Sequence, residues 1–269
     1  MMITATKEFA PLLKSWRTRC GISQLELSLR CEVSQKHISF LEQARNAPSK
    51  IMVQLLCDAL DIPLRDRNSL LLAAGFAPGY QESDLSAPEL SAVDQALTMM
   101  MNQQEPFPAM IVDECYNVLR ANSGAMKLQG LVYGVERPED FPETAGNLLH
   151  GFFAPDGYRD HISNWADIAP CILKRLQAEA WAAGGNSGLQ ELLAKLTSFP
   201  GVPEDWKQHV PGDWLAPVLT VDISKNGINL SFFSTIATLG TPQDVTLQEI
   251  RIESWFPANT VTRDYFMDG

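Results

Sequence analysis

The chain has 269 residues, 45% of them hydrophobic, and a formal net charge of −11. This length suits two domains of ~100–200 residues each, and no run of ~18 apolar residues is present that could span a membrane. Charged residues, among them Lys7, Glu8 and Lys14, interrupt the start of the chain where a secretion signal would be apolar. We therefore expect a two-domain cytoplasmic protein.

The charge is divided unevenly along the chain. Residues 1–80 contain ten basic and seven acidic residues, a net charge of +3, whereas residues 81–269 contain eleven basic and twenty-five acidic residues, a net charge of −14. A locally basic segment beside an acidic remainder is typical of a separate nucleic-acid-binding module. The acidic remainder should repel DNA and confine contacts with the DNA backbone to the basic segment.

Motifs that carry catalysis or metal binding are missing from the sequence. The five cysteines and four histidines are scattered, and no CxxC, HExxH, GxSxG or phosphate-binding glycine loop occurs. We expect no metal site, no cofactor and no enzymatic activity.

Two short helical patterns lie between Gly21 and Glu42, after a first predicted helix over residues 5–19. Ser23 and Ser34 stand where each helix would begin, and a serine hydroxyl there can accept a hydrogen bond from a free backbone amide. Ile38 and Leu41 follow core spacing in the second helix. The sequence therefore predicts a pair of capped helices joined by a turn.

The outer face of the second helix carries side chains suited to DNA. Its hydrogen-bonding residues are Ser34, Gln35, Lys36, His37 and Ser39. The major groove presents a distinct pattern of donors and acceptors for each base pair, which such side chains can read. An ordinary helical hairpin with a solvated face would show the same pattern.

These residues resemble the helix-turn-helix of the Cro/repressor class, in the xenobiotic-response-element (XRE) family of bacterial regulators. In such motifs a glutamine opens the first helix, here Gln24, and a small residue lies where the helices cross, here Ser28. The turn usually contains a glycine, but this chain has Glu32. A left-handed backbone at Glu32 would cost about 1 kcal/mol, so we expect a strained or differently shaped turn.

Two more predicted helices complete an all-α, five-helix repressor-type head. One begins at Pro48–Lys50 and the other covers roughly residues 64–74. The start of the fourth helix is flanked by polar residues suited to phosphate, namely Arg45, Asn46, Ser49 and Lys50. We expect Gln24, Ser49 and Lys50 to hold backbone phosphates while Gln35, Lys36 and Ser39 contact bases; solvated loop residues are the alternative.

Domain boundaries follow from composition. The stretch from Gly75 to Pro88 is rich in Gly, Pro and Ser and lacks periodicity. We therefore place the helix-turn-helix domain at residues 1–76, a linker at 77–88, and a ligand-binding and dimerisation domain at 89–269.

The second domain is predicted to be α+β with a five-stranded antiparallel sheet. PAMIVD and CYNVLRA are typical of two strands, and Asn122 can cap the helix that follows. Residues 144–208 are helical in pattern. VLTVDIS and INLSFFSTIAT then flank Asn226–Gly227, a strong hairpin signal, and DVTLQEIRIESWF is expected to be the last strand.

Several of these segments resemble MmyB-like transcription regulators. They are GFAPGY, PFPAMIVDECYNVLRAN, Asn164–Trp165 and STIATLGTPQDVTLQEIRIESWFPAN, and residues 129–157 and 182–213 match weakly. Two strands followed by Asn and a helix also resemble the opening of a PAS-type sensor domain. The resemblance implies an XRE head joined to a PAS-like domain that binds a small apolar ligand, with a fatty acid as one implied ligand.

Candidate ligand contacts are aromatic, apolar and polar residues of the second domain: Phe107, Met110, Arg159, Asn164, Trp165, His209 and Phe232. An apolar pocket with a few polar anchors suits such a ligand, although each of these residues could instead belong to the core.

We expect a homodimer that binds double-stranded DNA and regulates transcription. The main alternative is an antitoxin-like autoregulator whose acidic domain holds another protein; an enzyme fused to a DNA-binding head is a third.

Overall fold

The computed structural model describes residues 2–135, 137–184, 187–208 and 218–268. Contacts between residues divide the chain into two compact units, one of Met1–Ser83 with Thr241–Gln248 and one of Asp84–Gly240 with Glu249–Gly269. The first unit thus contains a segment that lies far along the sequence from the head. The boundaries expected from composition stay a prediction.

The first unit is built on five helices, as the sequence predicted. They are α1 (Met2–Arg19), α2 (Gln24–Arg30), α3 (Gln35–Glu42), α4 (Lys50–Ala59) and α5 (Leu64–Ala73). Their inward faces form one apolar core that includes Phe9, Leu13, Leu27, Ile38, Leu41, Val53, Leu56 and Leu70. This confirms the five-helix head.

Serine hydroxyls cap three of these helices. The Oγ atoms of Ser23, Ser34 and Ser49 each accept a hydrogen bond from the backbone amide three residues later, at 3.0, 3.2 and 3.2 Å. Each cap satisfies one of the amides that a helix start leaves free and contributes about 0.5–2 kcal/mol. The predicted helix starts are therefore confirmed at α2, α3 and α4.

The turn between α2 and α3 has the backbone that usually requires glycine. Glu32 has a φ of 53°. Its amide donates to Leu29 O at 3.3 Å and the Val33 amide donates to Ser28 O at 2.9 Å, which is the hydrogen-bond pattern of a Schellman motif. The turn after α1 has the same pattern with Gly21 at a φ of 67°. The helix-turn-helix therefore has an ordinary turn shape with a strained residue in it.

The second unit contains a five-stranded antiparallel sheet in the order β2-β1-β5-β4-β3. The strands are β1 (Ala109–Val112), β2 (Val118–Ala121), β3 (Val221–Lys225), β4 (Ile228–Ala237) and β5 (Arg251–Pro257). β5 is central, pairing Ile252 with Ile111 of β1 and Trp255 with Ser234 of β4. The α+β fold with five antiparallel strands is thereby confirmed.

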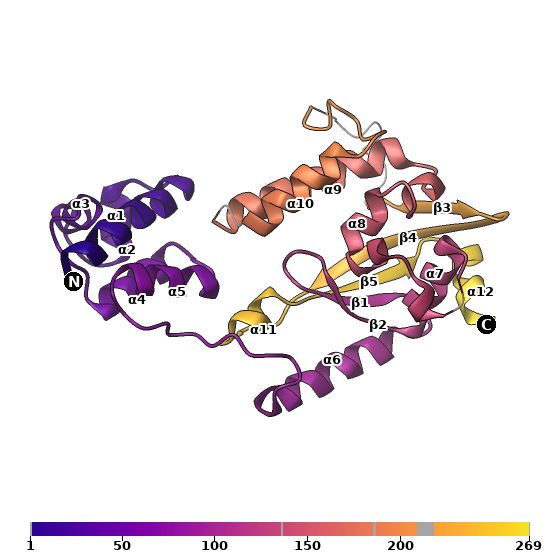
Figure 1. Ribbon diagram of the computed structural model, residues 1–269, viewed down its shortest axis with the longest axis horizontal. Helices are drawn as coiled ribbons and strands as arrows, with labels where there is room; N and C mark the ends of the chain where they lie inside the picture. The colour runs from indigo at the N-terminus through magenta and orange to yellow at the C-terminus, as the bar shows by residue number, and fades with distance from the viewer. Residues whose placement is uncertain (1, 136, 185–186, 209–217, 269) are drawn as a thin grey trace. The chain divides into compact units, whose positions relative to one another are not determined.

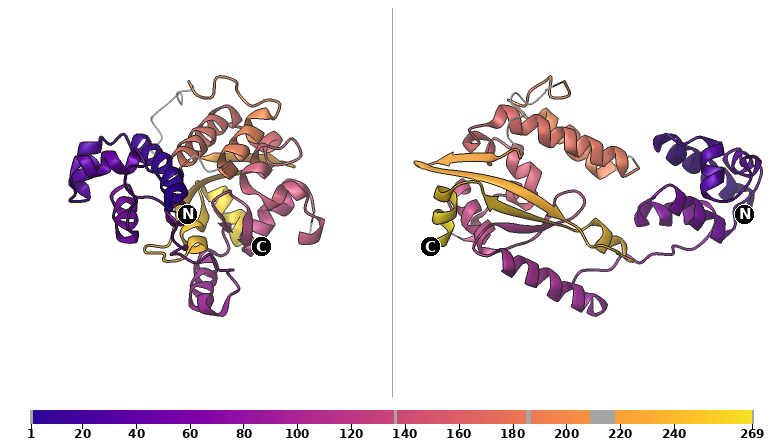
Figure 2. Two further views of the ribbon diagram at one scale, coloured as in Figure 1. Left: turned by 60° about the vertical axis from the view of Figure 1, so that its left-hand side comes forward. Right: turned by 180° about the vertical axis from the view of Figure 1, so that it is seen from behind.

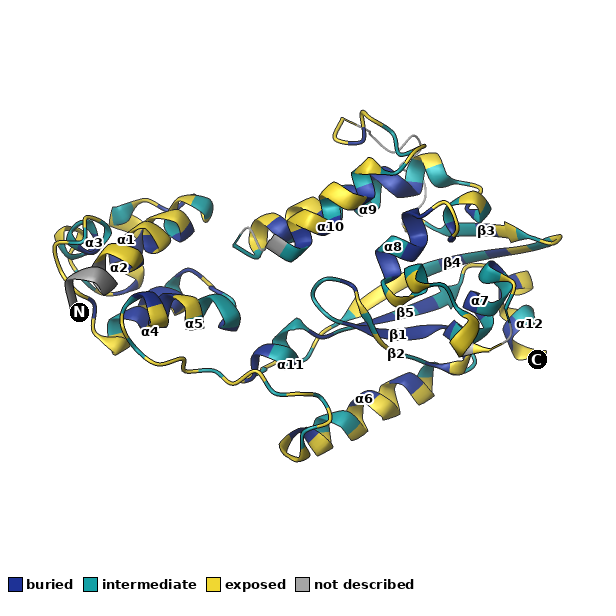
Figure 3. Cartoon of the chain, in the orientation of Figure 1, coloured by how far each residue is buried: buried dark blue, intermediate teal, exposed yellow. Residues whose placement is uncertain are grey.

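Helices lie on both sides of this sheet (Figures 1 and 2). α6 (Ser91–Gln104) follows η1 (Pro88–Leu90) and runs along one side. On the other side are α7 (Ser123–Tyr133), α8 (Leu148–Phe153), α9 (Trp165–Ala182) and α10 (Ser187–Ser198), with η2 (Pro138–Asp140), η3 (Glu143–Gly146) and η4 (Arg159–His161) between them. α12 (Thr260–Met267) packs against β4 and β5. The main core lies between the sheet and α7–α9, and β1 is wholly buried (Figure 3).

Two asparagines have the predicted roles. Asn122 Oδ1 accepts the Ala125 amide at 2.9 Å and so caps α7, and it also accepts the Ala109 amide at 2.8 Å. Asn226 and Gly227 have φ values of 53° and 79° and form the two-residue turn between β3 and β4. Both local signals are confirmed.

The prediction of a strand over DVTLQEIRIESWF was wrong for the first half of this segment. Residues Val245–Glu249 form a short helix, α11, and only Arg251–Pro257 is a strand. Asp244 Oδ1 accepts the Thr246 amide at 2.9 Å, which stabilises a helix start rather than an extended chain.

Hydrogen bonds hold the α11 segment within the first unit. The Val245 amide donates to Gln81 O at 2.8 Å, and Asp244 Oδ2 accepts the Ser83 amide at 3.1 Å. Gln248 Oε1 accepts the amide of Leu64, the first residue of α5, at 2.6 Å. α5 has Pro63 at its N-cap and no side-chain cap of its own, so Gln248 supplies the acceptor for one of its free amides.

None of the helices in the described ranges is long and apolar enough to cross a membrane.

We predict that Glu32→Gly stabilises the first unit by about 1 kcal/mol, because glycine adopts a positive φ without the steric cost that a side chain adds. Urea unfolding followed by circular dichroism measures the change. Gln54→Gly is the matched control: Gln54 is exposed within α4, so glycine there should destabilise by about 1 kcal/mol. Destabilisation by both variants would contradict the assignment of strain to Glu32.

Candidate DNA interface and ligand cavity

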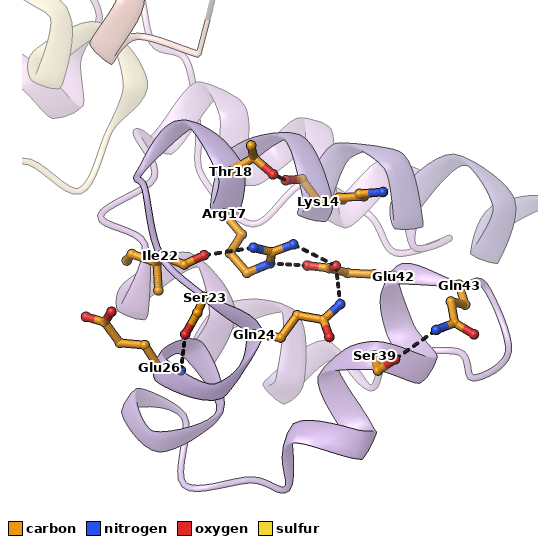
Figure 4. Close-up of polar contacts among 10 residues, drawn as sticks. All are labelled: Lys14, Arg17, Thr18, Ile22, Ser23, Gln24, Glu26, Ser39, Glu42 and Gln43. Atoms are coloured by element: carbon orange, nitrogen blue, oxygen red, sulfur yellow. Dashed lines mark hydrogen bonds and ion pairs between the residues drawn. The ribbon is translucent and has the colours of Figure 1, made fainter.

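A buried carboxylate joins the first three helices of the head (Figure 4). Glu42, whose side chain is 2% exposed, accepts hydrogen bonds from Arg17 Nε at 2.5 Å and Arg17 Nη2 at 3.0 Å. Gln24 Nε2 donates to the same carboxylate at 2.7 Å, and Arg17 Nη1 donates to Ile22 O at 2.8 Å. Arg17 belongs to α1, Gln24 to α2 and Glu42 to α3. The hydrogen bond with Glu42 raises the pKa of Arg17.

This arrangement fixes the orientation of α3 on the head. Ion pairs that are largely buried require well-placed hydrogen bonds, and losing one partner leaves an uncompensated charge. It also places the Gln24 amide nitrogen on Glu42, inside the head. A phosphate contact by Gln24 stays a prediction.

The outer face of α3 carries the side chains expected to read bases. Gln35 and Lys36 are exposed and Ser39 is half-buried, whereas Ile38 and Leu41 are buried. His37 is also half-buried, and the Ser34 hydroxyl is used as the helix cap. The structure therefore brings these candidates onto one helix, with Gln35 and Lys36 the most accessible.

Two further residues of this face were missed from the sequence. Gln43 Nε2 donates to Ser39 Oγ at 2.8 Å (Figure 4). The ring of Phe40 lies between two cations, with Lys36 Nζ at 5.4 Å and the Arg45 guanidinium carbon at 5.6 Å from its centroid. Both contacts have a signal in spacing, since Gln43 and Phe40 follow Ser39 and Lys36 by four residues.

The start of α4 presents the candidate phosphate contacts. Arg45, Asn46, Ser49 and Lys50 are all exposed. Ser49 caps the helix, and the amides of a helix start carry partial positive charge. Lys36, Arg45 and Lys50 are the basic residues of this region.

The expected ligand contacts of the second unit have structural partners. Met110 and Phe232 belong to the main core, and the partly buried Phe107 packs against it. Arg159 donates to Pro200 O, and Trp165 Nε1 donates to Gly201 O at 3.1 Å. His209 lies outside the described residues.

Asn164, another expected ligand contact, bridges β3 to the start of α9. Its Nδ2 donates to Thr220 O at 2.7 Å and its Oδ1 accepts the Asp222 amide at 3.1 Å.

A cavity of about 300 Å³ lies within the second unit. Apolar groups dominate its wall, which consists of Leu148, Leu149, Phe152, Ile168, Cys171, Ile172, Val218, Leu219, Val221 and Trp255 with the polar residues Arg175, Ser234 and Glu253. None of the six expected ligand contacts that the structure describes lines it. The residues are drawn from α8, α9, β3, β4, β5 and the chain before β3, a combination that no local pattern reveals.

Three buried polar atoms of this wall make no hydrogen bond to any described part of the chain. They are Arg175 Nε, Glu253 Oε2 and Trp255 Nε1. Buried polar atoms are almost always paired in native proteins, so an unpaired group in a cavity wall indicates a ligand or water partner. The cavity is thus apolar with one polar region.

A network of charges lies behind this polar region. Glu179 Oε2 accepts hydrogen bonds from Tyr116 Oη at 2.8 Å and from Arg251 Nη1 at 2.6 Å. Arg175 Nε lies 3.8 Å from Glu179 Oε1, too far for a hydrogen bond. Arg251 is therefore neutralised by Glu179, and Arg175 is the cation that borders the cavity.

The described residues contain no cluster of three or more His, Cys, Asp or Glu side chains that could hold a metal ion.

A helix-turn-helix head with an exposed polar reading face, joined to a domain with an apolar cavity, is the architecture of a ligand-responsive DNA-binding regulator. The model of the helix-turn-helix family matches residues 13–66, and the model of the MmyB-like transcription regulator ligand-binding domain matches residues 93–266. The chain belongs to the MmyB-like transcription regulators. It is a DNA-binding regulator with a ligand-binding domain, and the family is not one of enzymes.

Other comparisons add little. No curated protein matches the chain. A solved structure described as an RNA-binding light-oxygen-voltage receptor is similar at 9% sequence identity with a TM-score of 0.28; the match covers 97% of this chain and 62% of that chain.

Proposed function

We propose that this chain is a cytoplasmic homodimer that binds operator DNA and responds to a fatty acid held in the cavity of its second unit. The observation that supports the ligand is the pairing of a mainly apolar wall with unpaired N–H groups of Arg175 and Trp255. An apolar chain suits the wall, and a carboxylate suits the N–H donors. Arg175, rather than the polar candidates Arg159, Asn164 and His209 named from the sequence, would anchor the carboxylate.

The dimer would place two heads on half-sites about 34 Å apart, one helical turn of DNA. Ligand binding would favour one relative placement of the heads over another, which requires different affinities for the two arrangements. The α11 segment supports this proposal because it lies between β4 and β5, both of which contribute to the cavity, and it caps α5 through Gln248.

Native mass spectrometry of the purified full chain tests the ligand. We expect a dimer that is heavier than two polypeptide chains. Denaturation should release the extra mass, and chromatography should identify it as an aliphatic acid. The antitoxin-like alternative predicts a co-purifying polypeptide instead, and that result would overturn the proposal. Arg175→Leu keeps most of the side chain's bulk but removes its N–H donors and charge, so it should lose the acid. Arg137→Leu, which changes an exposed arginine outside the cavity wall, should retain it.

For DNA binding, we assign base contacts to Gln35, Lys36 and Ser39 and phosphate contacts to Ser49 and Lys50. Gln35 and Lys36 have exposed side chains at the start of α3, the end of a recognition helix that meets the bases. Lys50 begins α4 beside its free amides.

We predict that Gln35→Ala weakens binding to the cognate operator by about 1–3 kcal/mol and reduces the preference over scrambled DNA, because a glutamine paired with adenine makes two hydrogen bonds. An operator obtained by selection from random duplexes provides the probe for fluorescence anisotropy. Gln54→Ala, which changes an exposed glutamine of α4, should leave both values unchanged. An equal loss on cognate and scrambled DNA would remove Gln35 from the base contacts.

We predict that Lys50→Ala lowers affinity uniformly across sequences and reduces the slope of log affinity against log salt by about 1, since one phosphate contact is lost. Titrations at several salt concentrations measure the slope. Lys14→Ala removes the same charge from an exposed site of α1 outside the proposed contacts, and should leave the slope close to that of the parent. An unchanged slope in Lys50→Ala would exclude Lys50 from the phosphate contacts.

A further inference from the structure

Glu253 is an acidic side chain in a place where charge is costly. It lies on the central strand β5, is 5% exposed and contributes to the cavity wall. Its Oε2 atom has no hydrogen-bond partner in the described ranges. A buried carboxylate without a full set of partners favours its neutral form.

Charged and polar groups of three elements act on Glu253. α9 contributes Arg175 and Glu179, β4 contributes Ser234, and Trp255 is two residues along β5. Burial raises the pKa of Glu253. The positive charge of Arg175 and the polar hydrogens of the Ser234 and Trp255 side chains near the carboxyl group oppose the shift, although Trp255 Nε1 is not at hydrogen-bonding geometry, and the negative charge of Glu179 adds to it. Arg251 and Tyr116 face Glu179 rather than Glu253.

A ligand carboxylate would meet two kinds of group in this region. Arg175 Nε and Trp255 Nε1 are unpaired donors, and each can donate to a carboxylate oxygen. Glu253 can join them only in its neutral form, because two ionised carboxylates at hydrogen-bond distance repel each other strongly. A neutral Glu253 has an O–H group that donates to the ligand, so all three groups become donors to one anion.

We propose that Glu253 binds the ligand carboxylate as a neutral carboxyl group that donates a hydrogen bond, so that binding takes up a proton wherever free Glu253 is ionised. The inference rests on the proposed fatty-acid function and adds to it a residue that determines specificity. The proton comes from solvent and adds to a Glu253 carboxylate oxygen, no covalent bond to the ligand forms, and the ligand stays an anion. The cavity would therefore bind a ligand carboxylate through the protonated carboxyl group of Glu253.

The sign of the pH dependence follows. The ligand anion stabilises protonated Glu253 and raises its pKa above that of the free protein. Binding is strongest at pH values below the pKa of free Glu253. Above it, affinity falls as pH rises, by up to about tenfold per pH unit because one proton is linked to binding.

Isothermal titration of the delipidated full chain with decanoate, from about pH 6 to about pH 9 where the free acid is ionised, tests the proposal. Two buffers with different ionisation enthalpies at each pH give the number of protons taken up. For the parent chain we expect affinity to fall with pH and the number of protons taken up to approach one at the alkaline end. Glu191→Gln, a change at an exposed carboxylate of α10 outside the cavity wall, should behave like the parent.

Glu253→Gln separates the outcomes. Its amide N–H₂ group donates at every pH, so this variant should keep decanoate binding while losing proton uptake and pH dependence. Binding by the parent chain with no proton uptake and no pH dependence would overturn the role of Glu253 and leave the fatty-acid proposal standing. Failure of the delipidated parent to bind decanoate at any pH would overturn the fatty-acid proposal itself.

Discussion

The sheet of the second unit depends on its central strand, β5, which joins the β2–β1 pair to the β4–β3 pair. β5 is hydrogen-bonded to β1 on one edge and to β4 on the other. It therefore sets the alignment of both neighbouring strands. Side chains alternate along a strand, yet Ile252, Glu253 and Trp255 are all buried. Both faces of β5 are therefore covered, and one of them supplies the polar region of the cavity. A strand covered on both faces gives a fixed position to a group as costly as Glu253.

Much of the fold follows from short-range chemistry. Ser23, Ser34 and Asn122 cap helices where the sequence predicted, and Asn226–Gly227 forms the expected turn. These predictions succeed because a cap or a two-residue turn is decided by atoms within three or four residues. Glu32 shows the limit of such rules: the left-handed turn persists without its usual glycine, because the packing of α2 on α3 outweighs a local cost of about 1 kcal/mol.

Long-range features could not be predicted in the same way. Glu42 looks like an ordinary polar residue at the end of α3, and only the fold brings Arg17 and Gln24 to its carboxylate. The alternation in DVTLQEIRIESWF is typical of a strand, but Asp244 and contacts with Gln81 turn its first half into α11. The cavity wall has the same origin, since Leu148, Arg175 and Glu253 come from distant elements. Aromatic content predicted an apolar site without indicating which aromatics face it.

In the proposed regulation, the α11 segment would link the cavity to the head. Only residues 249–252 separate Gln248, which caps α5, from Glu253 in the cavity wall. A hydrogen bond contributes about 0.5–1.5 kcal/mol net, whereas allosteric coupling between sites typically amounts to 1–3 kcal/mol. The Gln248 bond alone would therefore supply a small part of a useful coupling. The bonds of Asp244 with Ser83 and of Val245 with Gln81 lie in the same segment. If the three are made and broken together, their sum reaches the required range, so a rigid α11 segment that moves as one body is a condition for regulation by this route.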